Sequence, residues 1–396
     1  MIDISRKSWL KYFLFGSLYF SEGLQFSLTT VIVPIYLLDK GFSIPVVTIV
    51  TGVAGAPWYL KFVFGPTIDY FYQFGKKPFI IMGGFLGAIS LFILIYIDPF
   101  VSLIPFALFL FLSHLGIIYL DVSCDGWAIQ ISKEKERGKI NGAMFAGLFA
   151  GMAFGTSVIA SIAQAYGYGM SFLAGGSIIL VIMVYPILVN EAKILKKRQK
   201  IASLLKEEFK KRTTQLVALF GFVSAISYGL LLFVIPLYMK TILQMDIGQI
   251  GLVTTIYPIT LVIGSLLGGT MADRWSRKMV LFIFLCVIIV FSAALIYANT
   301  WQIIAIIYGA IGFLNGGYLV TSSTLMMDVT NPKICTTQYS ILASICNFGE
   351  YGAGSISGSL VVMLGFGRVF LYSAWSIGPA LLILYFIRVK KNVMYP

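Results

Sequence analysis

Twelve long apolar runs constrain the fold of this 396-residue chain more than any other feature. Each is close to 20 residues or longer, the length at which a helix crosses a hydrocarbon core about 30 Å thick. The runs occupy residues 10–37, 46–68, 79–97, 101–127, 140–165, 169–189, 214–238, 250–271, 279–297, 301–326, 338–364 and 368–388. A buried core helix needs only a shorter run, and 59% of the residues are hydrophobic. The sequence predicts an all-α polytopic membrane protein with twelve transmembrane helices in two six-helix bundles.

The positive charges predict the orientation of these helices. If the N-terminus faces the cytoplasm, nearly all of the 29 Lys and Arg residues fall on the cytoplasmic side. The opposite side has only Lys40, Lys240 and Arg368. Since cytoplasmic loops carry the excess of Lys and Arg, both termini are expected in the cytoplasm of a cell-membrane protein. The net charge of +13 is thus explained by topology in the lipid bilayer, and no nucleic-acid partner is expected.

One long hydrophilic stretch, residues 190–213, divides the twelve runs into six and six. It separates an expected N-terminal bundle (1–189) from a C-terminal bundle (214–396). Within and beside it, Ile194, Ile201, Leu205 and Phe209 recur at helical spacing. This pattern favours either a basic amphipathic helix on the inner leaflet or a solvated linker helix.

The two halves repeat a short loop pattern. The second run ends in "GPTIDYFYQFGKK" and the eighth in "GGTMADRWSRK", so Gly65–Asp69 and Gly269–Asp273 have the same spacing and basic residues follow both. In the same way, Asp125 closes the fourth run and Asp328 closes the tenth. Two six-helix repeats are an architecture of secondary transporters.

These loops resemble the signature of the major facilitator superfamily. The resemblance implies two bundles that rock around a central cavity, with the second, fifth, eighth and eleventh segments at the seam between them. It also implies that Asp69 and Asp273 sit against the helix N-termini of segments eleven and five, which a carboxylate stabilises. The residues that this reading assigns to gating are Lys61, Gly65, Asp69, Lys76, Lys77, Asp121, Asp125, Gly269, Asp273, Arg274, Arg277, Lys278 and Asp328.

Glycine spacing supports a moving interface on the same reading. Gly147, Gly151 and Gly155 in segment five, Gly264 and Gly268 in segment eight, and Gly354 and Gly358 in segment eleven permit close helix packing. Gly65 has the same expected use at the end of segment two. Because glycine pairs are common in membrane bundles, this signal is weak.

Charged residues inside the apolar runs are costly and therefore mark candidate sites. Glu22, with Gln25 on its face, and Glu350 lie deep in their segments, and segment four carries the only histidine, His114. Buried carboxyl and imidazole groups can exchange protons near neutral pH. The candidate residues for substrate or proton binding are Glu22, Gln25, His114, Tyr228, Asn315, Tyr318 and Glu350. For each, a structural hydrogen-bonded role is the alternative.

Lys61 lies within the second run, on the face shared by Gly65 and Asp69. We expect it to form an ion pair with Asp121 or Asp125 inside the first bundle. A substrate clamp is the alternative.

The first half also resembles the subgroup of muropeptide permeases, acetyl-CoA transporters and folate–biopterin transporters, through "PWYLKFVFGPTID" and "DVSCDGWAIQISKEKERG". That resemblance implies uptake of a small polar or anionic metabolite by alternating access, with a proton as the candidate coupling ion. Segment four lacks the arginine of many proton-coupled members, and segment five lacks the Gly-Pro of the drug exporters. Both differences weigh against a multidrug exporter.

Two other functions compete with transport of a soluble metabolite. A lipid or lipid-linked substrate flippase would use the same fold, and a largely apolar cavity in the second half would favour it. A membrane-embedded enzyme would need a motif such as HExxH, which is absent, so no enzyme activity is expected. We expect no metal, no cofactor and a functional monomer.

Overall fold

The computed structural model describes residues 8–71, 74–131, 137–191, 201–331 and 334–388, and this part of the chain is helical almost throughout. The elements of the first half are α1 (Ser8–Ser27), η1 (Leu28–Ile32), α2 (Val33–Asp39), α3 (Ile44–Ala54), α4 (Ala56–Tyr59), α5 (Lys61–Tyr70), α6 (Lys77–Leu94), α7 (Leu103–Ile131), α8 (Arg137–Phe154), η4 (Gly155–Ile159), α9 (Ala160–Tyr166) and α10 (Tyr168–Leu188). Those that follow are α11 (Ile201–Lys210), α12 (Arg212–Thr241), α13 (Ile247–Arg274), α14 (Arg277–Ala294), η5 (Leu295–Tyr297), α15 (Trp301–Asp328), α16 (Cys335–Leu364) and α17 (Phe366–Phe386).

Ten continuous helical segments in the described part are long and apolar enough to cross a membrane. The two further crossings are α3–α5 taken together and the more polar α16. The predicted twelve-helix membrane fold is therefore confirmed. The predicted run 46–68 is broken at Gly55 and Leu60, around Pro57. Proline lacks the N–H of a helical hydrogen bond and its ring crowds the preceding turn, which explains the break.

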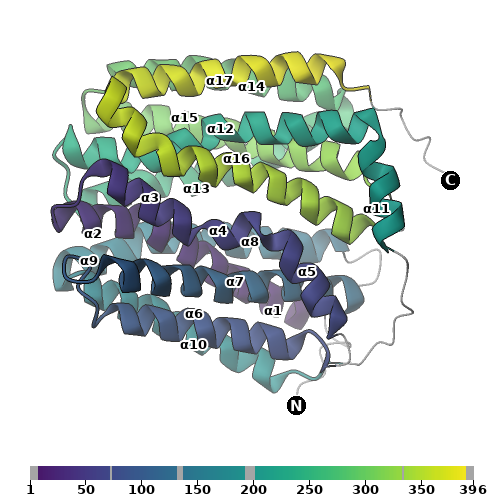
Figure 1. Ribbon diagram of the computed structural model, residues 1–396, viewed down its shortest axis with the longest axis horizontal. Coiled ribbons are helices and arrows are strands. Elements are labelled where there is room, and N and C mark those ends of the chain that lie inside the picture. The colour runs from purple at the N-terminus through teal and green to yellow at the C-terminus, as the bar shows by residue number, and fades with distance from the viewer. Residues whose placement is uncertain (1–7, 72–73, 132–136, 192–200, 332–333, 389–396) are drawn as a thin grey trace.

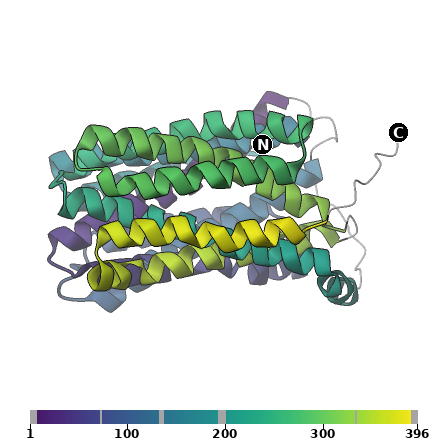
Figure 2. The ribbon, with the colours of Figure 1, turned by 90° about the horizontal axis from the view of Figure 1, so that it is seen from above.

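The helices form two groups that lie side by side. In the first half α1 packs on α8 and α6 packs on α7, and in the second half α13 packs on α15 and α12 packs on α16. Figure 1 shows the purple-to-blue helices of the first half below the green-to-yellow helices of the second, and Figure 2 shows the same helices from above. We call the end with α11 and the start of α1, at the right in Figure 1, the inner end. The opposite end, where α2 ends and α3 begins, is the outer end.

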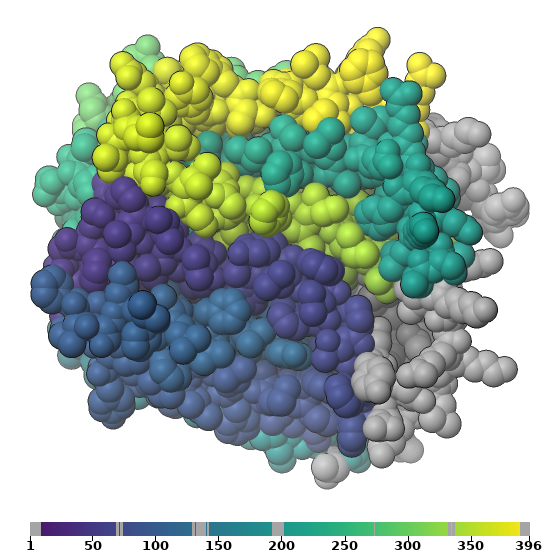
Figure 3. Space-filling model, viewed as in Figure 1, coloured from purple at the N-terminus to yellow at the C-terminus, as the bar shows by residue number. Residues whose placement is uncertain are grey.

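The seam between the halves is formed by the segments that the sequence predicted. On one side α3, α4 and α5 pack on α16, and on the other α8, η4 and α9 pack on α13. Figure 3 shows the purple surface of α3 directly against the yellow-green surface of α16. The two crossings that are least apolar thus face each other. A crossing in the seam can carry more polar side chains, because the other half shields them from lipid.

Most of the glycines expected at the seam pack inside one half instead. Gly147 and Gly151 lie against the α1 backbone, and Gly264 and Gly268 lie against α15. Gly155 packs on Ser27 and Gly354 on Phe233, again within one half. This part of the prediction was wrong, since GxxxG spacing indicates a close approach but does not identify the neighbouring helix.

The seam uses other glycines, which the sequence analysis did not select. A Cβ at Gly52 would overlap Ser355, and one at Gly55 would overlap the Tyr351 ring. Gly358, which was predicted, approaches Ile44 and Thr48 across the seam. These three glycines allow α3 and α16 to touch along the outer half of the molecule.

A basic residue ties the third and last crossings of each half, α6 to α10 and α14 to α17, in the same way. Lys77 Nζ donates to the carbonyl oxygens of Ile187, at 2.9 Å, and Val189, at 2.7 Å, at the C-terminus of α10. Lys278 Nζ donates to Tyr385 O, at 2.9 Å, near the C-terminus of α17. A cation is stabilised at a helix C-terminus. The predicted repeat is thus visible in matching side-chain contacts.

The described part of the hydrophilic stretch forms α11, which docks on the second half. Asn331 Nδ2 donates to Glu208 Oε1 at 2.7 Å, and Lys211 Nζ lies 2.6 Å from Glu208 Oε2. Phe209 packs against the apolar core of the second half. Ile194 lies outside the described residues. These contacts attach α11 to protein, and whether its other face lies on the inner leaflet stays a prediction.

Candidate transport site

The first half contains a buried cluster of charged groups, built from α1, α5 and α7. Lys61, the first residue of α5, forms an ion pair with Asp121, and its Nζ lies 4.0 Å from Asp125 Oδ2. The Tyr19 hydroxyl donates to Asp125 Oδ1 at 2.5 Å. The Lys61 ammonium also lies 5.8 Å from the centre of the Trp58 ring. The expected pairing of Lys61 with an α7 aspartate is present, and both aspartates take part.

Glu22 adds a third carboxyl group to this cluster. Its side chain is buried in α1 within hydrogen-bonding reach of Asp121, while its Oε2 atom has no partner among the described residues. Two carboxyl groups can share a hydrogen bond only if one of them is protonated. With three carboxyl groups around one ammonium, a bound proton lowers the cost of burying the excess negative charge. The predicted role of Glu22 in proton binding stays a prediction.

His114 has both ring nitrogens occupied. Trp58 Nε1 donates to His114 Nδ1 at 3.0 Å, and His114 Nε2 lies 2.6 Å from Thr29 Oγ1. Because Nδ1 accepts a hydrogen bond, the ring is neutral and its proton is on Nε2. A second proton would remove the bond from Trp58. This arrangement favours the structural role that the sequence left as the alternative.

Gln25 is fully buried in α1, and neither atom of its amide group has a hydrogen-bond partner among the described residues. Each such unpaired group costs about 1–3 kcal/mol. A side chain with both amide atoms unpaired is therefore suited to a water molecule or a polar ligand. This supports the predicted binding role of Gln25.

The second half has a polar centre without a positive charge among its described side chains. Asn315 Nδ2 of α15 donates to the Tyr257 hydroxyl of α13 at 3.0 Å, and the rings of Tyr257 and Tyr308 stack at 4.8 Å. The side chains of Tyr228 and Tyr257 also lie near each other. The sequence predicted Asn315 and Tyr228 here but missed Tyr257 and Tyr308, because tyrosines in apolar runs are too common to stand out.

Two small spaces adjoin this centre. One is lined by Tyr228, Leu231, Leu232, Tyr257, Tyr308, Ile311 and Asn315. The other is lined by Ser224, Ser227, Tyr228, Leu231, Leu285, Ile288, Asn315, Tyr318 and Ile377. Each has a volume of about 10 Å³, enough for about one water molecule, so a larger ligand would need the halves to move apart. Ser224 and the predicted Tyr318 are joined by a hydroxyl–hydroxyl hydrogen bond of 2.6 Å.

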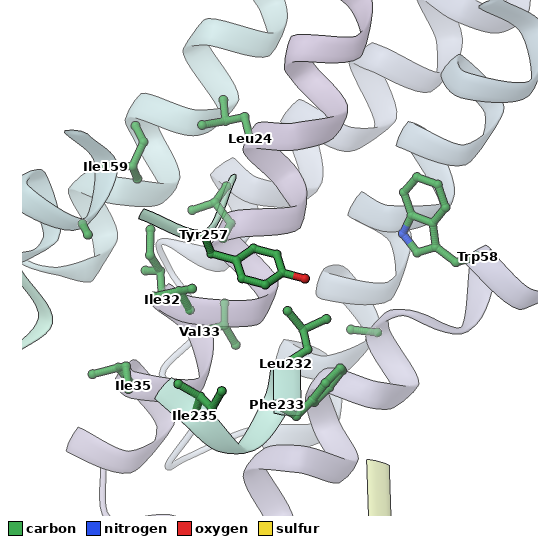
Figure 4. Close-up of a cluster of buried hydrophobic side chains, with 14 of the residues drawn as sticks. Leu24, Ile32, Val33, Ile35, Trp58, Ile159, Leu232, Phe233, Ile235 and Tyr257 are labelled. Atoms are coloured by element: carbon green, nitrogen blue, oxygen red, sulfur yellow. The ribbon is translucent and has the colours of Figure 1, made fainter. Parts of the chain in front are cut away.

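Tyr257 lies where the halves meet. Figure 4 shows its ring among Leu24, Ile32 and Val33 of the first half and Leu232 and Phe233 of the second, with the hydroxyl directed away from its own helix. The first-half residues belong to α1, η1 and α2, and the second-half leucine and phenylalanine belong to α12. The polar centre is therefore close to the seam.

Glu350 of α16 lies beside this polar centre. Its backbone contacts Gly229 of α12, next to Tyr228, and its carboxyl group is electrostatically close to Tyr228 and Tyr257. The side chain is partly exposed, and no hydrogen bond or ion pair joins it to another described residue. The neighbouring Tyr351 is close to both Glu350 and Glu22. The two predicted glutamates are thus brought toward each other across the seam.

The residues assigned to gating behave differently from one another. A Cβ at Gly65 would have no neighbour within 4 Å, and one at Gly269 would meet only Val320. The close approach expected at Gly65 is thus wrong for this conformation. The side chains of Asp69 and Asp273 lie outside the described part, so their contact with helix N-termini stays a prediction.

Apart from Arg274, the basic members of the gating set contact their own half. Arg277 pairs with Asp328 at 2.6 Å, and Arg274 is exposed. Lys76 and Lys77 donate their backbone N–H groups to Glu191, at 2.7 and 2.8 Å. With the helix-terminus contacts of Lys77 and Lys278 described above, these residues hold each half together in this structure.

Contacts across the outer end were not predicted. Lys240 of α12 pairs with Asp39 of α2 at 2.6 Å, and Tyr168 donates to the same carboxylate. On the other side of the seam, the hydroxyls of Thr156 and Thr255 lie 2.9 Å apart. These residues sit at segment ends or on a hydroxyl-rich face, and nothing in the sequence indicates their partners.

Hydrogen bonds continue along α3 and α16. Thr48 Oγ1 donates to Ser355 O at 3.2 Å and accepts from Gly358 N at 3.1 Å. Nearer the middle of the molecule, Asn347 Nδ2 donates to Trp58 O at 3.1 Å. Together with the tight glycines, these contacts close the outer half of the seam.

Comparison with known proteins agrees with this architecture. The chain is 24% identical over 417 residues to a protein of Haemophilus influenzae (strain ATCC 51907 / DSM 11121 / KW20 / Rd) described as an uncharacterized protein, with 94% of this chain and 93% of that protein covered. Among solved structures, it is similar to a D-xylose-proton symporter (TM-score 0.74, 15% identity, 99% of each chain).

Two further solved structures have the same fold. The nucleoside transporter NupG aligns with TM-score 0.78 at 14% identity, covering 96% of this chain and 99% of that one. A bacterial homolog of the human lysosomal transporter Spinster, inward-facing and occupied, aligns with TM-score 0.76 at 12% identity, covering 98% and 97%. The family model of the Major Facilitator Superfamily matches residues 15–220 and 217–394. The chain therefore belongs to the Major Facilitator Superfamily.

Proposed function

We propose that this protein is a secondary active transporter that moves a small polar metabolite across the cell membrane by alternating access, with a proton as the coupling ion. The two halves, residues 1–189 and 214–396, act as the moving bodies, and 190–213 links them. Both termini face the cytoplasm, and one chain is the working unit.

The observation that carries this proposal is the uneven seam. Its outer half is closed by glycine contacts and by a few polar bonds between α3 and α16. Near its inner end, by contrast, a Cβ at Gly65 would have open space around it, and one at Gly269 would touch only Val320 of its own half. The contacts of the outer half can break and re-form without exposing a large apolar surface. This supports a closed outer end that opens when the halves rock.

The charged cluster of the first half is the proposed proton site. Glu22 or Asp121 holds the proton while Lys61 neutralises the other carboxylate. Loss of the proton would leave an uncompensated negative charge in the membrane interior, which favours rearrangement around Lys61. Tyr351, close to Glu22 and Glu350, connects this event to the second half.

Transient currents from proteoliposomes test this function with a panel of neutral, cationic and anionic small solutes. We expect an inward proton gradient to drive uptake of at least one solute class. Glu22→Gln should lose gradient-driven uptake while retaining solute exchange. Asp98→Asn is the control and should retain both, because it changes an exposed carboxylate that pairs with Lys40 at the outer end. Undiminished gradient-driven uptake by Glu22→Gln would remove this carboxyl group from the coupling mechanism.

Hydroxyl and amide groups stand among the mainly apolar side chains that line the second-half spaces, and they support a soluble metabolite over a lipid. Tyr228, Asn315 and Ser224 face these spaces together with leucines and isoleucines. A flippase cavity would need a continuous apolar wall for acyl chains. Flux of water-soluble against lipid-linked solutes in the same liposomes distinguishes these two functions.

A further inference from the structure

We propose that the transported substrate is an organic cation, a compact amine whose ammonium group binds Glu350 and the tyrosine faces of the second half. This inference rests on the transport function proposed above and names its substrate class. It replaces the sequence-based expectation of an anionic metabolite.

Carboxyl groups outnumber ammonium groups among the described residues at the centre of the molecule, which favours a cationic substrate. Glu22, Asp121 and Asp125 on one side of the seam and Glu350 on the other are four carboxyl groups. Lys61 is the one described ammonium among them, and it is already paired with Asp121. An anion in this place would meet carboxylates without a free cation to bind it, whereas a cation would be attracted.

Glu350 provides the anchor. It has no ion-pair or hydrogen-bond partner among the described residues, although it lies midway along α16 inside the membrane. A carboxylate at this depth is costly unless something neutralises it. Its partial exposure and its position beside Tyr228 leave its carboxyl group accessible to a ligand.

Aromatic rings supply the second recognition element. Tyr228, Tyr257 and Tyr308 line the first of the two small spaces, and Tyr228 and Tyr257 lie within electrostatic range of Glu350. Tyrosine rings attract an ammonium group placed over their faces, most strongly when water is excluded. Carboxylate and ring faces together select a desolvated cation over a neutral solute of the same shape.

The unpaired hydroxyl group of Ser227 is a second indication of a ligand, and it does not depend on the charged residues. Its side chain is 3% exposed and lines the second space, yet its hydroxyl has no partner among the described residues. The neighbouring Ser224 is occupied by Tyr318. A polar group on the substrate, at the end opposite its ammonium, would satisfy Ser227.

Three probes of nearly equal size and shape test the charge preference: tyramine (cation), 4-hydroxyphenethyl alcohol (neutral) and 4-hydroxyphenylacetate (anion), each with an aliphatic counterpart. Binding to the purified full-length protein is measured by thermal stabilisation and transport by uptake into proteoliposomes. We expect the cations to bind at least tenfold more tightly than the neutral and anionic members. Glu350→Gln should weaken cation binding by roughly tenfold to a hundredfold and leave the neutral probe unchanged.

Two further variants keep the assignment falsifiable. Glu350→Asp should retain the preference for cations, and Ser227→Ala should weaken hydroxylated amines more than amines without a hydroxyl group. Equal binding of all three charges, tighter binding of the anion, or no stabilisation by any amine would overturn the assignment. If an anionic or neutral solute is nevertheless transported, only the substrate class is wrong. If no solute of any class moves, the transport function itself fails.

Discussion

The carboxylate of Asp39 and the ammonium of Lys240, 2.6 Å apart, join the last residue of α2 in the first half to the end of α12 in the second. Tyr168 donates to the same carboxylate and so fixes it from α10. Both charged side chains are partly exposed, at 35% and 26%. The pair lies across the outer end and must separate if that end opens.

Removing this ion pair should shift the protein toward an outward-open form. An exposed pair of this kind contributes at most about 1 kcal/mol, so Lys240→Met should raise the outward-open population by up to about fivefold. Distances between spin labels at the outer ends of α2 and α12 report this population. The exchanged pair, Asp39→Lys with Lys240→Asp, should restore the wild-type distances. A single change that leaves them unaltered would show that the pair does not help to close the outer end.

The seam glycines should matter more than this pair. Gly52→Leu would place a side chain where Ser355 lies, so α3 and α16 could not close, and transport should fall at least tenfold while the protein still folds. Gly65→Leu is the matched control, because the space around Gly65 is open. Uptake and circular dichroism of the two variants check this. Equal uptake by both variants would contradict the role of Gly52 in closing the outer half of the seam.

The sequence predicted those features whose energetic cost or gain depends on the residue itself, such as an apolar run or a charge inside the membrane. The twelve crossings follow from the length of apolar runs. The pairing of Lys61 with Asp121 followed because a lone charge in the membrane is costly and both residues lie on helix faces that meet. Glu350 was selected as a candidate for the same reason, and its role stays a prediction.

The sequence could not predict features that depend on which distant residue a side chain or glycine contacts. Gly147 and Gly52 look alike in sequence, yet one packs within the first half and the other closes the seam. Asp39 and Lys240 resemble ordinary charges at segment ends. Without homologous sequences that vary together, a single chain does not reveal which distant residue each will meet.

His114 should prove structural. Its neutral ring accepts from Trp58 and contacts Thr29, which joins α4, α7 and η1. His114→Ala leaves buried groups unpaired and should cost about 1–3 kcal/mol of stability for each orphaned group. Thermal unfolding in detergent should show this loss, while gradient-driven uptake per folded molecule persists. If uptake became independent of the proton gradient in a stable variant, His114 would instead belong to the proton path.

Acid should loosen the attachment of α11. Burial raises the pKa of Glu208, but hydrogen bonds from Lys211 and Asn331 outweigh it, so the net pKa lies below the usual 4.5. A lowered folded-state pKa contributes stability that is present above about pH 4.5 and is lost as the pH falls through the folded-state value. Hydrogen exchange of the α11 amides, corrected for its intrinsic pH dependence, should therefore rise below that pH. Glu208→Gln should exchange fast throughout, and pH-independent protection of the wild type would refute the assignment.

The ion pair of Lys61 with Asp121 can be tested by reversal. Removing either partner leaves an uncompensated charge in a buried site, at a cost of about 3–5 kcal/mol, so Lys61→Asp and Asp121→Lys should each lower folded yield and uptake sharply. The double change restores opposite charges between α5 and α7 and should recover folded protein. On the proposed coupling mechanism it should not recover coupling, because Glu22 would then face a lysine on α7 in place of the carboxyl group proposed to share its proton. Folded yield and gradient-driven uptake of the four proteins separate these effects. Failure of the double variant to regain any folded yield would show that the two side chains act independently, and full recovery of coupling would show that the proton does not depend on the Glu22–Asp121 contact.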